Sequence, residues 1–208
     1  MVPLGADAPD FALPDLDGSI VRRDDFVQKN ALLVAFICNH CRYTFHIKEC
    51  FAKMAAEYQE RGVGVVAINA NDDTYAEDAP HLMAHDAKSF GFTFPYLYDE
   101  SQEVARAFGA ACTPDLFLYD GGLRLAYRGQ FDETRPKNGA AHGSDLRAAL
   151  DAVLAGTDPP SLQKPSMGCN IKWRSGREPD HFKPGPLYPV SRGLARVLSR
   201  LVTFGTKV

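Results

Sequence analysis

The chain has 208 residues, of which 45% are hydrophobic and 24% charged, and its formal net charge is −3. A chain of this length and composition can bury a core of its own, which excludes general disorder, and its near-neutral charge argues against a strongly basic nucleic-acid-binding protein. The charge is unevenly distributed. No acidic residue follows Asp180, and the five basic residues there carry +5, which leaves −8 of the total for residues 1–180.

Alternating strand-like and helix-like segments over residues 1–156 predict one α/β domain. A continuous apolar run at 31–37 is typical of a central strand buried on both faces, and apolar residues at steps of three and four over 39–60 indicate an amphipathic helix that ends at Gly62. The expected elements, in chain order, are a hairpin of residues 11–13 and 19–21, a strand at 31–37, a helix at 39–60, a strand at 63–69, a helix at 78–91, a strand at 95–98, a helix at 101–108, a hairpin of residues 116–119 and 123–127, and a helix at 144–154 with Ser144 as its N-cap.

Two further segments follow the predicted domain. Residues 157–190 are rich in proline and glycine, so we expect an irregular tail packed on the domain. Residues 191–208 are expected to form a basic amphipathic helix, with arginines every four residues from Arg192 to Arg200. The favoured interpretation is that this helix packs on its own acidic domain or in a homodimer, and contact with an anionic membrane surface is the less favoured one.

The number of cysteines bears on the cellular compartment. Five cysteines, in a chain too long to need disulfide staples, argue against a secreted disulfide-rich module. The first residues lack the features of a signal peptide, and the longest apolar run, Ala31–Cys38, is too short to span a bilayer. We therefore expect a cytoplasmic protein in which some thiols are free or reactive.

The clearest chemical motif is Cys38-Asn39-His40-Cys41, placed where a buried strand gives way to a helix. The N–H groups and dipole at a helix N-terminus favour a thiolate, so we expect Cys38 to be the activated thiol. With two intervening residues, Cys41 can close a disulfide with it. His40 adds a positive charge that tunes the pKa of the pair. The alternative interpretation is that the two cysteines only cap the helix or fill the core.

A second motif, Cys112-Thr113-Pro114, leads directly into the strand predicted at 116–119. A proline at the entrance to a sheet needs special geometry, often a cis peptide bond. The order of strand, CxxC helix, strand, Thr-Pro strand, hairpin and helix is that of thioredoxin-fold proteins, in which the cis-proline lies beside the cysteine pair and helps to bind extended substrate. We therefore expect Thr113 and Pro114 to shape a substrate site.

With these motifs, the sequence resembles bacterial thioredoxin-family proteins of the redoxin superfamily, also named AhpC/TSA after alkyl hydroperoxide reductase and thiol-specific antioxidant. The resemblance covers about residues 5–180. It implies a thioredoxin-like α/β fold, with a central mixed sheet flanked by helices, an N-terminal hairpin and a C-terminal extension. One departure is Arg42, where the family usually has proline, and its charge is expected to tune the pair. The segments that carry the resemblance are 36–41, 66–69, 94–96, 112–115, 127–132 and 165–173.

The resemblance implies a thiol-disulfide oxidoreductase that acts in redox homeostasis and needs no cofactor. Cys38 would attack a substrate disulfide, and Cys41 would then displace the product from the mixed disulfide. The expected partners are protein disulfides and a thiol reductant such as a thioredoxin or glutathione system, with peroxide as a further candidate substrate. No nucleic-acid partner is expected.

Two other functions stay open. Peroxiredoxins resemble one another in a Pro-x-x-x-Thr/Ser-x-x-Cys site, and none of Cys38, Cys41 or Cys50 is preceded by that pattern. A thiol peroxidase, slower than dedicated enzymes, is therefore the alternative enzyme. A redox-sensing or metal-binding module is the non-enzymatic alternative, although the cysteine pair lacks an obvious third ligand and we expect no metal.

The remaining cysteines have different expected roles. Cys50 falls on the apolar side of its helix, which favours packing in the core. Cys112 lies two residues before Pro114 and is either a third thiol near the pair or a buried structural residue. Cys169 lies in the tail, and either folds back as a resolving or regulatory thiol or anchors the tail through its neighbours.

Other titratable residues give weaker signals. His81 and His85 share a helical face at metal-ligand spacing, but no third ligand lies nearby in the sequence, so a solvated face is favoured. The strand before Cys38 contains no carboxylate that could accept a proton. Glu49, Glu57 and Asp99 remain candidates for that role by elimination only.

Overall fold

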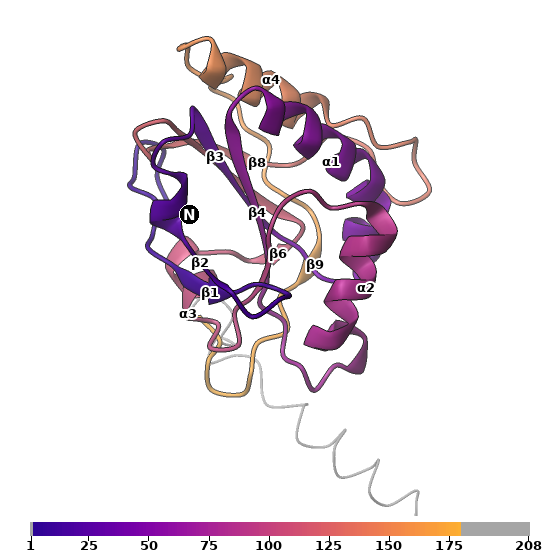
Figure 1. Ribbon diagram of the computed structural model, residues 1–208. Helices are drawn as coiled ribbons and strands as arrows, with labels where there is room; N and C mark the ends of the chain where they lie inside the picture. The colour runs from indigo at the N-terminus through magenta and orange to yellow at the C-terminus, as the bar shows by residue number, and fades with distance from the viewer. Residues whose placement is uncertain (1, 180–208) are drawn as a thin grey trace, which may run out of the picture. The chain divides into compact units, whose positions relative to one another are not determined.

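The structure is a computed structural model that describes residues 2–179. Its centre is a mixed five-stranded sheet with the strand order β5, β4, β3, β7, β8 (Figure 1). The first three of these strands are mutually parallel, and β7 and β8 run antiparallel to their neighbours. The strands comprise β3 (Ala31–Phe36), β4 (Val63–Asn69), β5 (Tyr96–Tyr98), β7 (Asp115–Asp120) and β8 (Leu125–Gly129).

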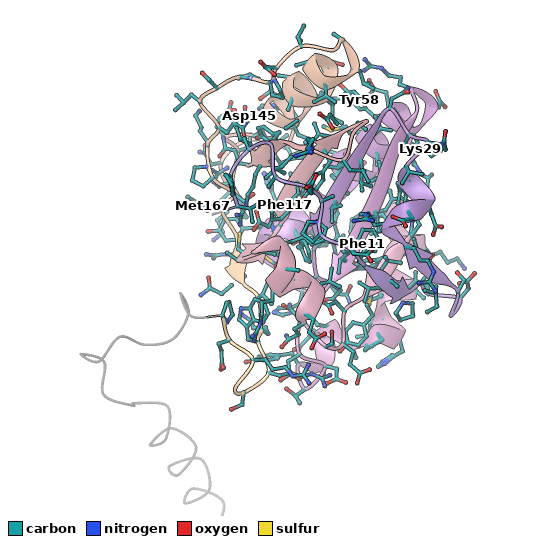
Figure 2. The ribbon with its side chains drawn as sticks, turned by 90° about the vertical axis from the view of Figure 1, so that its left-hand side faces the viewer. Phe11, Lys29, Tyr58, Phe117, Asp145 and Met167 are labelled. Atoms are coloured by element: carbon teal, nitrogen blue, oxygen red, sulfur yellow. The ribbon has the colours of Figure 1, made fainter. Side chains whose placement is uncertain are left out.

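Helices cover both faces of this sheet because its central strands are buried on both sides. In β3, Leu33 and Ala35 face a cluster that includes side chains of α1, α2 and α4, whereas Leu32 and Val34 face α3 and the N-terminal hairpin. Phe117 of β7 lies inside the molecule on the second side (Figure 2). The covering elements are α1 (Arg42–Glu60), α2 (Pro80–Phe90), α3 (Glu103–Phe108), α4 (Ser144–Leu154), the 3₁₀ helices η1 (Arg23–Phe26) and η2 (Ala76–Asp78), and the hairpin of β1 (Ala12–Pro14) and β2 (Ile20–Arg22).

The predicted order of elements is confirmed, with two corrections at helix starts. Gly143, and not Ser144, is the N-cap of α4, in a left-handed conformation with φ of 67°. A Cβ atom on Gly143 would lie 2.1 Å from Cε of Met54, so the site requires glycine for space as well as for conformation. Helix α1 begins at Arg42 with Cys41 as its N-cap, three residues later than expected.

The tail forms one unexpected strand. Residues 157–179 are otherwise irregular, as predicted, but β9 (Cys169–Asn170) pairs antiparallel with β6 (Cys112–Thr113). A two-residue strand has no periodicity that a sequence can show. The described residues up to Arg177 belong to one compact unit. The basic helix expected at 191–208 lies outside the described residues, and within residues 2–179 no helix is long and apolar enough to cross a membrane.

A buried carboxylate beside α4 predicts a pH-dependent stability. Burial acts to raise the pKa of Asp132, but hydrogen bonds from Thr134, Gly143 and His142 outweigh it and hold the pKa below its usual value. A depressed pKa contributes stability above the unfolded value, near 3.9, and this contribution is lost as the pH falls through the folded pKa. We expect Asp132→Asn to lower the free energy of unfolding by about 1–3 kcal/mol at neutral pH. In urea unfolding experiments, the difference in the free energy of unfolding between Asp132→Asn and the natural protein should close below about pH 4. A difference that does not depend on pH would contradict this account.

Candidate redox site

The two cysteines of the motif lie together beside the Thr113–Pro114 segment, as predicted. Cys38 follows the end of β3, Cys41 caps α1, and both are free and only 1% exposed. The Cys38 Sγ atom lies 3.2 Å from the Thr113 Oγ1 atom, and a protonated Cys41 Sγ donates a hydrogen bond to the Thr113 carbonyl oxygen at 3.0 Å. The Thr113–Pro114 peptide bond is cis, as the sequence predicts. Thr113 thus contacts both sulfurs, and the two cysteines strongly perturb each other's pKa.

The pKa values of the two cysteines are shifted in opposite directions. The pKa of Cys38 is raised, first by its hydrogen bond to Cys41, then by burial and by the carboxylate of Asp78. The pKa of Cys41 is lowered, chiefly by the hydrogen bond from Cys38 and, against the effect of burial, by the N–H groups of Thr44 and Cys169. Because α1 begins after Cys41, the N-terminus of the helix lies next to Cys41, and the expectation that Cys38 is the activated thiol stays a prediction.

A carboxylate that the sequence analysis did not consider for the site organises the CxxC turn. Asp78 is fully buried and accepts the backbone N–H groups of Asn39 and His40 at 2.9 and 3.3 Å. It also pairs with His40 Nδ1 at 2.7 Å and accepts a hydrogen bond from Asn71 Nδ2 at 2.6 Å. These bonds satisfy the backbone N–H groups of the turn between the cysteines. The sequence did contain a signal for Asp78. Because β4 is parallel to β3, the residues that follow the two strands meet at one edge of the sheet.

Asn39, the first residue between the cysteines, is held from two further sides. Lys48, buried in α1, donates from Nζ to the Asn39 carbonyl oxygen at 3.0 Å and pairs with Asp86. The hydroxyl of Tyr96 donates to the Asn39 Oδ1 atom at 3.0 Å. Sequence reasoning missed both contacts, because a lysine on an amphipathic helix normally faces solvent. The turn between the cysteines is thus fixed by buried polar groups.

The three carboxylates named by elimination lie elsewhere. Glu49 forms an exposed ion pair with Lys53, and Glu57 forms an ion pair with Arg147. Asp99 is buried, but it accepts the N–H of Ala105 in the first turn of α3. Among the described residues, the carboxylate placed beside Cys38 is that of Asp78.

The residues expected to tune the pair act on different partners. His40 lies near Cys38, but its ring pairs with Asp78. Arg42 is exposed, and its charge acts on Cys169. Cys38, His40 and Asp78 place potential metal-ligand atoms within 4.8 Å of one another. The Asp78 oxygens already accept several hydrogen bonds, so a metal would have to displace the contacts that shape the turn. His81 and His85 are exposed on α2, as expected.

The other three cysteines lie in three different environments. Cys50 is partly buried and packs against the core on the α1 side, which confirms its predicted role. Cys112 is buried, its Sγ lies 3.4 Å from the Pro114 carbonyl oxygen, and burial raises the pKa of its thiol, which favours the structural interpretation. Cys169 folds back beside the pair, since it lies opposite Thr113 in the β6–β9 register, and Cys169 and Cys41 act on each other's pKa.

Comparison with known proteins agrees with this architecture. Residues 4–129 match the AhpC/TSA family. The chain is 32% identical over 120 residues to the thiol-disulfide oxidoreductase ResA of Geobacillus thermodenitrificans, an alignment that covers 57% of this chain and 64% of that protein, which is less than two thirds of its length.

Two solved structures extend the comparison. A hypothetical protein from Sinorhizobium meliloti 1021 is 50% identical, with a TM-score of 0.83, over 85% of this chain and 97% of that chain. A putative thiol:disulfide interchange protein DsbE from Chlorobium tepidum is 24% identical, with a TM-score of 0.57, over 72% of this chain and 99% of that chain, and it shows the shared thioredoxin-like α/β fold. Because the family match extends over more than half of its residues, the chain belongs to the AhpC/TSA family of thioredoxin-like redoxins.

Proposed function

We propose that the protein is a thiol-disulfide oxidoreductase that cycles Cys38 and Cys41 between a dithiol and a disulfide. The observation that carries the proposal is that two buried sulfurs at the start of α1 both contact Thr113, the residue before the cis proline. The similarity to ResA, itself a thiol-disulfide oxidoreductase, supports the same reaction class.

The pKa shifts of the two cysteines suggest how the first step begins. The pKa of Cys41 is lowered and that of Cys38 is raised, each chiefly by the other, so in the proposed scheme a Cys41 thiolate takes the proton of Cys38 and produces the Cys38 thiolate. Cys41 has a partner in either state, because its thiol can donate to the Thr113 carbonyl oxygen and its thiolate accepts two N–H groups. In this scheme Cys41 acts as the base for Cys38.

The exchange then proceeds in two steps. The Cys38 thiolate attacks one sulfur of a substrate disulfide, which breaks and releases a substrate thiolate. Cys41 gives its proton to the released substrate thiolate and attacks Cys38 Sγ, so that the second substrate thiolate leaves and the Cys38–Cys41 disulfide forms. The substrate is reduced by two electrons and the pair is oxidised. Since both residues are only 1% exposed, binding of a protein substrate must shift the segments that cover them.

Trapping of substrates tests the proposal. In Cys41→Ser the mixed disulfide on Cys38 cannot be resolved, so extracts treated with this variant should give disulfide-linked adducts at Cys38. Cys50→Ser, which leaves the pair intact, should give none that persist. Adducts at Cys112 or Cys169 in a protein that retains Cys38 would contradict the assigned roles.

A thiol peroxidase is the second candidate, and one observation favours it. The Thr113 hydroxyl, 3.2 Å from the Cys38 sulfur, supplies from another element the hydroxyl that the residues before Cys38 lack. Fast, thiol-recycled consumption of peroxide without reduction of insulin disulfides would support this candidate over the oxidoreductase. The cytoplasmic location, the partners and the homodimer stay predictions.

A further inference from the structure

The tail approaches the cysteine pair as a paired strand. Cys169 lies opposite Thr113 in the β6–β9 register, and Asn170 lies opposite Cys112 (Figure 1). The backbones are so close that a Cβ atom on Gly168 would lie 2.1 Å from the Thr113 carbonyl oxygen. Glycine at this position is therefore what lets the tail reach the segment that contacts both sulfurs.

Contacts on both sides of Cys169 fix the strand in place. Before it, the Ser166 hydroxyl donates to the Gly129 carbonyl oxygen at 2.7 Å, and Met167 lies at the surface (Figure 2). After it, Ile171 is buried in the core, and the N–H of Lys172 donates to Asn71 Oδ1 at 2.9 Å. Asn71 is the residue that donates to Asp78. The tail and the CxxC turn thus share one buried polar network.

This arrangement brings a third sulfur to the pair. Cys169 lies opposite Thr113, whose carbonyl oxygen is 3.0 Å from the Cys41 sulfur, and Cys169 and Cys41 act on each other's pKa. Cys38 and Cys41 are 1% exposed, whereas Cys169 is only partly buried. Of these three sulfurs, Cys169 is the one that an external thiol meets first. Burial and Cys41 raise the pKa of the Cys169 thiol, while the charges of Lys172 and Arg42 act against them.

We propose that Cys169 is a third redox thiol, which takes the disulfide from the Cys38–Cys41 pair and presents it at the surface to a small thiol or dithiol reductant. This proposal rests on the proposed function of the pair. It removes a difficulty of access, because a reductant that cannot reach two buried sulfurs can attack a sulfur that is partly exposed. Exchange between Cys169 and Cys41 takes place beside Thr113, which pairs with Cys169 and whose carbonyl oxygen contacts the Cys41 sulfur.

The exchange balances without an added oxidant. Cys169 attacks Cys41 Sγ, the Cys38–Cys41 bond breaks, the Cys41–Cys169 bond forms, and Cys38 leaves as a thiolate that takes up the proton lost by Cys169. A reductant thiolate then attacks Cys169 Sγ and releases the Cys41 thiolate. A second reductant thiol displaces Cys169, so that the reductant leaves as a disulfide and all three thiols are restored.

Disulfide mapping of the full chain tests the proposal directly. Trypsin cuts after Lys29 and Arg42, so Cys38 and Cys41 fall in one peptide, 30–42. Cys169 falls in peptide 148–172, because Lys164 precedes a proline. A Cys38–Cys41 disulfide makes peptide 30–42 lighter by two hydrogens, and a Cys41–Cys169 disulfide joins the two peptides. In glutathione redox buffers we expect both products in the natural protein and the joined pair in Cys38→Ser.

A kinetic experiment measures how fast glutathione reduces the Cys38–Cys41 disulfide. In Cys169→Ser the Cys38–Cys41 disulfide should still form, but its reduction should slow roughly tenfold or more. Gly168→Ala keeps the thiol but disturbs its strand pairing, so it should yield less of the joined peptides. Cys50→Ser, tested as a matched control, should behave as the natural protein does.

Two results would overturn the proposal. One is a Cys38→Ser protein that is folded by circular dichroism and forms no joined peptides when oxidised, and the other is Cys169→Ser reduced by glutathione at the natural rate. In either case a normal Cys38–Cys41 disulfide in the protein that retains both cysteines would leave the proposed function standing. Failure of the proposed function itself would appear as absence of that disulfide under every oxidising condition.

Discussion

Replacing Cys38 with serine is expected to reduce the rate of insulin disulfide reduction roughly 1,000-fold or more, to near the uncatalysed rate. A serine hydroxyl at this position is not ionised at neutral pH and cannot form the mixed disulfide. The variant should remain folded, because serine is nearly isosteric with cysteine and can keep the contact to the Thr113 hydroxyl.

The matched control for that experiment is Cys50→Ser on the adjacent helix. Cys50 is partly buried, packs against the core on the α1 side and takes no part in the proposed reaction, so its loss should leave turnover near the natural rate. Turnover in Cys38→Ser that stays within a few-fold of the control would show that another thiol attacks the substrate, and Cys169 would then be the first to replace.

The second large effect is expected at Asp78, in stability and in thiol reactivity. Asp78→Ala removes a buried acceptor and leaves the N–H groups of Asn39 and His40 and the amide of Asn71 without their partner. We expect the free energy of unfolding to fall by about 3–5 kcal/mol, which urea denaturation would measure. Glu77→Gln, an exposed neighbour with the same loss of charge, is the control and should change stability little.

The Asp78→Asn variant tests the effect of the Asp78 charge on the Cys38 thiol separately from the effect of Asp78 on stability. The Asp78 carboxylate contributes to the raised pKa of Cys38, after the hydrogen bond with Cys41 and burial. Removal of its charge should therefore lower that pKa, so that alkylation of Cys38, read as labelling of peptide 30–42 in Cys41→Ser, begins at a lower pH. An unchanged alkylation profile in a folded variant would show that Asp78 acts only as a structural acceptor.

The sequence predicted the elements of the sheet well where the pattern is long. The apolar runs that became β3 and β4, and the amphipathic repeat of α1, lie within a few residues of their predicted bounds. Hydrophobic periodicity reports which faces are buried, and burial decides the position of such elements. The corrected N-cap of α4 had no such signal, because Ser144 is a good N-cap by type and only the packing of Gly143 against Met54 decides otherwise.

The candidate site, like the fold, could be predicted from the sequence only in part. The spacing of Cys38 and Cys41, their place between strand and helix, and the Thr113–Pro114 segment were readable because each depends on residues close in the chain. Sequence reasoning could not place Asp78 beside the CxxC turn, because this residue lies about forty positions further along the chain. Local propensity cannot report a hydrogen bond that the sheet topology creates.

By itself, then, the sequence determined a thioredoxin-like domain, its cysteine pair and its cis-proline, since covalent spacing and periodic burial are properties of short segments. Only the tertiary structure decided which groups surround that pair. Parallel pairing of β3 with β4 brings Asp78 beneath the CxxC turn, and pairing of β6 with β9 brings Cys169 to Cys41. Contacts between residues far apart in the chain depend on how the elements pack, and packing sets the protonation and access of these thiols.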